Sequence, residues 1–244
     1  GSDPRRLTEA PGRDAHPFFL ADGRIVFQSP RDYQANGEVD LYVMAGDGSD
    51  QRRIVVAAGF DGVPVPSPDG SRIAFQRGLR SASGEYHWEL FVVDSSGLNE
   101  RQLTRNAWSS QVPSWSPDGQ RLVILANPSG RDRLFLLDPA TGATTPLAPS
   151  PRGDDTGPAF SPEGRFVAFI STRDGTRDLY RVELGSGEVT RLSRALDVWS
   201  QASWSPDGRR LLFSAKVAGH DEIFVIDSDG NGLARLTRGG DGKR

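Results

Sequence analysis

The four-residue stretch Ser67-Pro68-Asp69-Gly70 decides the fold, because it returns along the chain at a nearly constant interval. The other copies are Ser116-Pro117-Asp118-Gly119, Ser161-Pro162-Glu163-Gly164, Ser205-Pro206-Asp207-Gly208 and the degenerate Leu20-Ala21-Asp22-Gly23. Their last glycines stand at 23, 70, 119, 164 and 208, which gives spacings of 47, 49, 45 and 44 residues. Proline presets φ, aspartate caps locally and glycine accepts a positive φ, so each copy predicts a tight turn between two β-strands.

Every repeat shows the same four apolar segments around this turn. In the fourth copy a strand ends at Phe160 before the turn, and a second strand covers residues 166–169 after it. A nearly continuous apolar run follows at 179–182, and a short amphipathic segment at 191–193 ends the repeat. Four strands in about 45 residues are typical of a β-propeller blade. We therefore expect an all-β propeller of four-stranded antiparallel blades, with approximate blade limits at 9–55, 56–104, 105–148, 149–193 and 194–237.

The repeat resembles that of the TolB-type propellers. Their pattern combines the Ser-Pro-Asp-Gly turn with an acidic residue before the third strand and a terminal Arg-Leu-Thr. The acidic position is matched by Asp40, Glu89, Asp178 and Glu222, whereas Arg133 departs from it. The resemblance implies a module that binds proteins or peptides near a central channel. It also implies that a metal ion can occupy that channel.

The number of blades follows from the number of turns. Five turn motifs predict five blades, and the alternatives are a six-bladed ring or a fragment of a larger propeller. Arg6-Leu7-Thr8 is an additional copy of the terminal motif ahead of the first turn. We expect residues 3–8 to form an extra outer strand that closes the ring by pairing, near residues 5–8, with the last blade.

Composition excludes several classes of protein. The 244 residues carry a formal net charge of −3, which argues against a nucleic-acid-binding protein driven by bulk charge. No run of about 18 apolar residues occurs, so we expect no membrane span. Cysteine is absent, which removes disulfides, thiolate metal sites and cysteine catalysis. The resemblance favours a periplasmic or secreted bacterial protein, and we expect a monomer.

The loops between blades share one rim of a propeller with the loops between the second and third strands of each blade. Loops of varied sequence on a rigid scaffold usually carry function, and the segments 30–39 and 77–88 are predicted to be long loops on this rim. The candidate polar residues at the channel mouth are Asp14, His16, Asp61, Gln111, Asp154, Asp155 and Gln201. The candidate aromatic contacts on the rim are Tyr86, Trp88, Trp108 and Trp199.

Three aspartates could converge at that mouth. Asp14, Asp61 and Asp155 precede the innermost strands of three blades, and carboxylates gathered in this way can hold Ca²⁺. Two of them could instead form the acid/base pair of a glycosidase, or each could simply cap a local turn. We expect a non-enzymatic module that binds a protein or peptide on this rim and requires no cofactor, with Ca²⁺ possible in the channel. The alternatives are a carbohydrate-active or sugar-binding propeller and a structural or assembly fragment.

Overall fold

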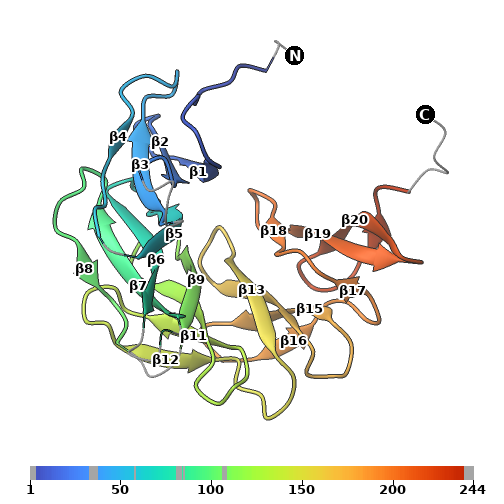
Figure 1. Ribbon diagram of the computed structural model, residues 1–244. Helices are drawn as coiled ribbons and strands as arrows, with labels where there is room; N and C mark the ends of the chain where they lie inside the picture. The colour runs from blue at the N-terminus through green and yellow to red at the C-terminus, as the bar shows by residue number, and fades with distance from the viewer. Residues whose placement is uncertain are drawn as a thin grey trace. The chain divides into compact units, whose positions relative to one another are not determined.

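The computed structural model describes residues 4–32, 38–57, 59–80, 84, 86–105 and 109–238, and in these residues every regular element is a β-strand (Figure 1). Blade one contains β1 (Ala15–Phe19), β2 (Ile25–Ser29), β3 (Asp40–Met44) and β4 (Arg52–Arg53). Blade two contains β5 (Phe60–Pro66), β6 (Arg72–Arg80), β7 (Tyr86–Asp94) and β8 (Arg101–Gln102). Blade three contains β9 (Ser110–Trp115), β10 (Leu122–Ala126), β11 (Arg133–Leu137) and β12 (Thr144–Leu147).

The remaining strands continue the same order. Blade four contains β13 (Asp155–Phe160), β14 (Phe166–Ser171), β15 (Asp178–Glu183) and β16 (Val189–Arg191). Blade five contains β17 (Asp197–Val198), β18 (Ser203–Trp204), β19 (Arg210–Val217), β20 (His220–Asp227) and β21 (Ala234–Arg235). Strands adjacent in sequence are neighbours in each sheet, except that β17 and β18 both pair with β19. The predicted all-β fold of four-stranded antiparallel sheets is confirmed, and the number of blades in a closed ring stays a prediction.

The repeated turn is held by its serine. In blade two the Ser67 hydroxyl donates to Asp69 at 2.5 Å and accepts the Arg72 backbone N–H at 3.0 Å. The Gly70 N–H donates to the Ser67 carbonyl at 2.8 Å, and Gly70 adopts a φ of 68°. A side chain would be strained at this φ, so the residue types of the motif follow from the geometry of the turn.

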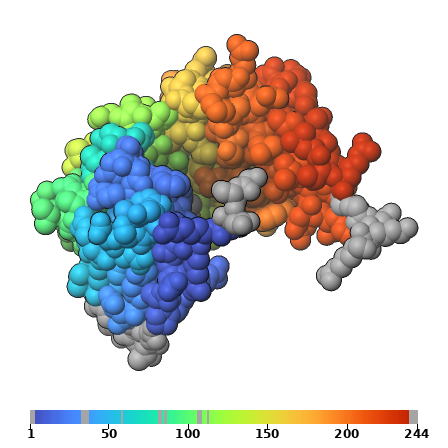
Figure 2. Space-filling view, turned by 90° about the horizontal axis from the view of Figure 1, so that it is seen from above, coloured from blue at the N-terminus to red at the C-terminus, as the bar shows by residue number. Residues whose placement is uncertain are grey.

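The chain divides into two compact units, residues 1–115 with 139–142 and residues 116–138 with 143–244. In the first unit, one face of blade one packs on the Phe75–Phe91 pair of blade two. In the second unit, blade three packs on the Phe169–Tyr180 pair of blade four in the same way. Figure 2 shows the yellow-to-red atoms of blades four and five as one continuous mass, and their shared core has the Phe213–Phe224 pair at its centre. Each of these cores therefore joins one blade's aliphatic face to the next blade's aromatic pair.

A buried ion pair fixes the fourth strand to the third, and we call it the strand lock. In blade four Arg191 donates to Asp178 at 2.6 Å. The Ser193 hydroxyl donates to Asp178 at 3.0 Å and accepts the Leu179 N–H at 2.9 Å. The equivalent positions are Asp40, Arg53 and Val55 in blade one, Glu89, Gln102 and Thr104 in blade two, and Glu222, Arg235 and Thr237 in blade five. Blade five keeps all the contacts, blade one keeps the ion pair, and blade two keeps the hydrogen bonds of its threonine. The acidic residue and the terminal Arg-Leu-Thr of the repeat are thus two halves of one interaction.

Blade three has no strand lock. Arg133 replaces the acidic residue and donates to the Gly153 carbonyl at 2.6 Å. The arginine and threonine positions of the terminal motif are occupied by Pro146 and Ala148. All three partners are replaced in the same blade, so no buried charge is left unpaired there.

The last blade exposes a face that the other blades bury. Leu212, Ile223 and Leu236 are 43%, 39% and 56% exposed. Their counterparts by strand register and sequence are at most 6% exposed in blades one to four; in blade four they are Ala168, Leu179 and Leu192. Blade five therefore carries an aliphatic face of the type that contacts the next blade elsewhere in the chain.

The N-terminal segment lies against blade one. Leu7 packs on a cluster that contains Phe27 and Tyr42, and its carbonyl accepts a hydrogen bond from the Gln51 side chain at 3.0 Å. Residues 4–9 form no strand. The expected pairing of residues 5–8 with the last blade stays a prediction.

Candidate functional site

Each of the three candidate aspartates pairs with an arginine of its own blade, which lies in the second strand or just after it. In blade two, Arg77 binds the buried Asp61 at 2.6 Å and also reaches Glu100 at 2.7 Å. Burial raises the pKa of Asp61 to about 6, although the hydrogen bond from Arg77 opposes this effect. The other two pairs are Arg31 with Asp14 at 3.2 Å and Arg173 with Asp155 at 2.9 Å.

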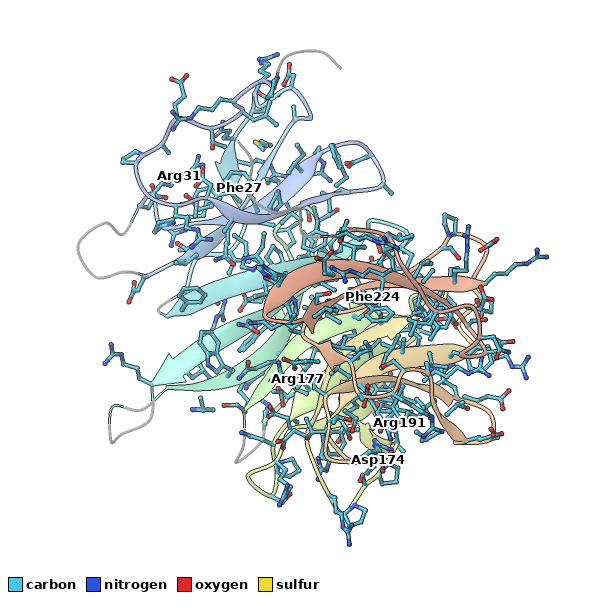
Figure 3. All side chains as sticks on the ribbon, turned by 90° about the vertical axis from the view of Figure 1, so that its right-hand side faces the viewer. Phe27, Arg31, Asp174, Arg177, Arg191 and Phe224 are labelled. Carbon is cyan, nitrogen blue, oxygen red and sulfur yellow. The ribbon has the colours of Figure 1, made fainter. Side chains whose placement is uncertain are left out.

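In all three blades the arginine also stacks on two aromatic rings. The Arg173 guanidinium carbon lies 5.1 Å from the centre of the Phe169 ring and 5.3 Å from that of Tyr180. Figure 3 shows the matching arrangement in blade one, where Arg31 lies beside Phe27. This stacking and the ion pair hold the guanidinium in one orientation. A sequence signal for the site exists that we did not use, because Phe27-Gln28-Ser29-Pro30-Arg31-Asp32 returns as Phe169-Ile170-Ser171-Thr172-Arg173-Asp174.

Pairing with arginine limits how these carboxylates can bind a metal ion. Asp61 and Asp155 are fully buried, and each already accepts at least one hydrogen bond from its arginine. Among the residues that the structure describes, no group of three or more His, Asp or Glu side chains could hold a metal ion. Ca²⁺ binding stays a prediction, and the observed contacts are those of structural ion pairs.

The innermost strands are bulged next to these aspartates. The strand register shifts in β1, β5 and β13, and the residues in the left-handed region are His16, Val63 and Gly157, with φ of 50°, 51° and 58°. A positive φ is uncommon for a β-branched residue such as Val63. The His16 side chain is exposed. The bulges bend the innermost strands at the level of the loop rim.

The predicted aromatic residues have different environments. Trp199 is 47% exposed. The Trp88 ring packs edge-on against Phe60 at 5.5 Å, so it supports a strand and is only partly accessible. Tyr86 begins β7, but its side chain lies outside the described residues, as does the whole of Trp108.

The remaining polar candidates are tied into local structure. The Gln201 side chain donates to the Pro158 carbonyl, and Gln111 is half-buried in β9. Asp154 is exposed, and its carboxylate accepts the Asp132 N–H at 3.2 Å. The segment 77–88, expected as a loop, is largely strand, because β6 continues to Arg80 and β7 begins at Tyr86.

Blade four carries a cleft on this rim that the sequence did not lead us to expect. Its volume is about 740 Å³, and its lining comes from three loops: Arg152, Thr172, Arg173, Asp174, Gly175, Arg191 and Arg194. We call it the arginine cleft. Arg173 and Arg191 are fixed by Asp155 and Asp178 behind them. Figure 3 shows Asp174 near Arg191, and the two form an ion pair at 3.5 Å.

Two further arginines of the cleft face solvent. The side chains of Arg152 and Arg194 are exposed, and their guanidinium groups make no hydrogen bond or ion pair with the residues that the structure describes. The Tyr180 hydroxyl donates to Oδ2 of Asp174 at 2.7 Å. The cleft therefore presents two free cationic groups above two that are held in place.

The described part of the chain contains no helix with the length and apolarity that crossing a bilayer requires.

The sheets and their turns define a β-propeller repeat protein. Residues 72–244 match the family model described as the TolB beta propeller domain. Because this match covers well over half of the sequence, the chain belongs to the TolB β-propeller domain family.

Relatives of known sequence match over part of the chain. An uncharacterized protein from Agrobacterium fabrum is 30% identical over 108 residues, which are 44% of this chain and 36% of that protein. The Tol-Pal system protein TolB from Francisella tularensis subsp. mediasiatica is 28% identical over 82 residues, or 33% of this chain and 19% of that protein. The matched part of the chain spans about a third or less of the length of these curated relatives.

Solved structures match over nearly the whole chain. A candidate TolB from Agrobacterium tumefaciens has a TM-score of 0.73 at 23% identity, with 96% of this chain and 83% of that chain covered. A puromycin hydrolase has a TM-score of 0.78 at 22% identity, with 99% of this chain and 41% of that chain covered. At these identities the likeness shows the fold, which proteins of different function share.

Proposed function

We propose that this chain is a non-enzymatic binding module that recognises a protein or peptide on the loop rim, in the periplasm or outside a bacterial cell. The observation that carries the proposal is the arginine cleft, which places exposed side chains of varied loops on a rigid four-stranded sheet. The TolB relative supports a protein partner, since its name assigns it to a multi-protein system. The location is an inference from the family resemblance.

A carbohydrate-active function is less well supported. A glycosidase needs two carboxyl groups about 5–10 Å apart that can reach a sugar. Asp61 and Asp155 are fully buried and bound to arginines, and Asp14 is bound to Arg31. None of the three is therefore proposed as a catalytic acid or base.

The proposal can be tested by selecting peptides from a random library on the whole chain and mapping the contact by amide hydrogen exchange. We expect slower exchange in the loops at 149–154, 172–177 and 192–196 when a selected peptide binds. Protection confined to the Ser-Pro-Asp-Gly turns would contradict the proposal, because those turns lie on the opposite rim.

An assembly function is the second candidate, and a specific observation favours it. The exposed Leu212, Ile223 and Leu236 form an aliphatic face whose counterparts contact a neighbouring blade. Sedimentation of the parent chain and of Leu236→Glu over a range of concentrations would test it. Self-association that the substitution abolishes would support assembly, and monomers at every concentration would remove the case for self-assembly.

A further inference from the structure

We propose that the arginine cleft of blade four binds the carboxylate side chain of an acidic peptide segment, an inference that rests on the proposed peptide-binding function. Arg173 follows β14 and Arg191 ends β16, whereas Arg152 and Arg194 lie in the loops that join blade four to its neighbours. Arginine binds carboxylates through two parallel hydrogen bonds, which makes a set of guanidinium groups selective for planar anions.

The inner arginines form a rigid floor. Arg191 donates to Asp178, Thr176 and the Ser193 carbonyl, at 2.6, 3.0 and 3.0 Å. Arg173 is held by Asp155, by two aromatic rings and by the Ser171 hydroxyl at 2.9 Å. Because Asp155 and Asp178 neutralise these two arginines and nearby groups accept their hydrogen bonds, they contribute a rigid surface and little free bonding capacity.

The outer arginines supply the free donors. Arg152 follows blade three's last strand and Arg194 follows the strand lock, so the two approach the cleft from different loops. Binding one carboxylate between them would restrain both exposed side chains and bring opposite charge to an otherwise unneutralised pair.

Asp174 restricts which anion fits. Its Oδ2 accepts the Tyr180 hydroxyl, and its Oδ1 accepts no hydrogen bond from the described residues. A doubly charged group such as phosphate would be repelled by this carboxylate. An aspartate or glutamate in a peptide brings one negative charge together with a backbone N–H that can donate to Oδ1. The arrangement therefore favours a peptide carboxylate over an inorganic dianion.

Blade one provides an internal comparison. It repeats the floor with Arg31, Asp32 and Arg53, but its residues at the positions of Arg152 and Arg194 are Pro11 and Val56. The floor is thus common to two blades, whereas the exposed arginines occur in one of them. We therefore assign a structural role to Arg173 and Arg191, and ligand binding to Arg152 and Arg194.

The test measures binding of fluorescein-labelled Gly/Ser peptides with a central Asp-Glu pair to the whole chain by anisotropy at low salt. The matched peptide carries Asn-Gln, and the protein variants are the double substitution Arg152→Gln/Arg194→Gln and the control Arg209→Gln. Arg209 is also exposed but lies at a Ser-Pro-Asp-Gly turn. We expect the double substitution and the Asn-Gln peptide each to weaken binding about tenfold or more, and the control to change it less than about twofold.

Three results would overturn the inference. They are equal binding of the two peptides, equal loss in the control variant, and displacement of the peptide by inorganic phosphate at equal concentration and matched ionic strength. If library peptides bind the loop rim of the double variant as tightly as they bind that of the parent chain, this inference fails and the proposed function stands. If no peptide of either kind binds the rim, both fail.

Discussion

Blades one and four share the same arginine ion pairs and ring contacts but differ in the third residue of the strand lock. Both stack an arginine on two aromatic rings, pair it with an aspartate at the start of the first strand, and fix the fourth strand through a second arginine. In blade four the lock also includes Ser193, whereas blade one has Val55 in its place. The comparison separates interactions that the two blades share from those that only one of them has, and it can be tested at matched positions.

The largest difference is expected at the aspartate ahead of the first strand. Asp155→Asn should lower the free energy of unfolding by about 3 kcal/mol, because Arg173 would remain largely buried without a charged partner. Asp14→Asn should cost about 1 kcal/mol, since its ion pair is longer and partly exposed. Urea unfolding of the two variants measures both values. Equal losses would show that burial of the pair does not decide its contribution.

The two locks should respond to pH in opposite directions. Burial raises the pKa of Asp40 to about 7, and Arg53 only partly opposes this. Burial also raises the pKa of Asp178, but hydrogen bonds from Thr176, Arg191 and others outweigh it, so the pKa is lowered overall. Asp40 thus binds its proton more tightly in the folded chain, and Asp178 less tightly.

The direction in which each residue changes stability with pH follows from the number of protons bound in the folded and unfolded chains. Between pH 4 and 7 the folded chain holds a proton at Asp40 that the unfolded chain has lost, so stability from this residue falls as pH rises, by at most about 4 kcal/mol. Stability from Asp178 is present above about pH 4 and is lost as pH falls further. The unfolding free energy of the parent, measured from pH 4 to 8, should fall relative to that of Asp40→Asn as pH rises. A constant difference between them would contradict the raised pKa.

Exchanging the side chains of Ser193 and Val55 should give blades one and four part of each other's strand lock. Ser193→Val should cost about 1–2 kcal/mol, because the Leu179 N–H and Asp178 would each lose a buried hydrogen bond. Val55→Thr, nearly the same in volume, should gain up to about 1 kcal/mol by supplying those bonds in blade one. Thermal melts of both variants provide the measurement. A loss of stability in Val55→Thr would mean that blade one cannot orient the new hydroxyl.

The smallest effect is expected at the aromatic residue that ends the first strand. Phe19 is 72% exposed, whereas Phe160 packs on the core that blades three and four share. Phe160→Ala should cost about 1–2 kcal/mol and Phe19→Ala less than about 0.5 kcal/mol. Similar losses in guanidinium unfolding would show that Phe19 is covered in solution.

The sequence predicted the sheets well because the turn motif has local causes. Ser67, Asp69 and Gly70 make their hydrogen bonds within a few residues of one another, so a short pattern is sufficient to identify them. The residues of the strand lock belong to the family pattern, but the pattern did not predict that they pair. A constant separation of 13 residues between Asp178 and Arg191, and between Glu222 and Arg235, was an available signal.

The candidate site was harder to predict for a physical reason. Asp61 and Asp155 were expected ahead of the innermost strands, and they lie at the start of β5 and β13. Their charge is neutralised by Arg77 and Arg173, which lie 16 and 18 residues away. The exposure of Arg194 depends on loop conformation, which no periodic pattern encodes. Sequence reasoning therefore located the rim and did not find the cleft on it.

The strand lock has a consequence for how such a chain can change over generations. Because the acid, the arginine and the hydroxyl group come from a single blade, duplication or loss of the corresponding stretch of gene carries the complete set with it. Blade three illustrates the other route, since Arg133, Pro146 and Ala148 replace the three partners together. Recombination at blade boundaries would thus leave no buried charge without its partner, and only the apolar contacts between adjacent blades would have to be matched again.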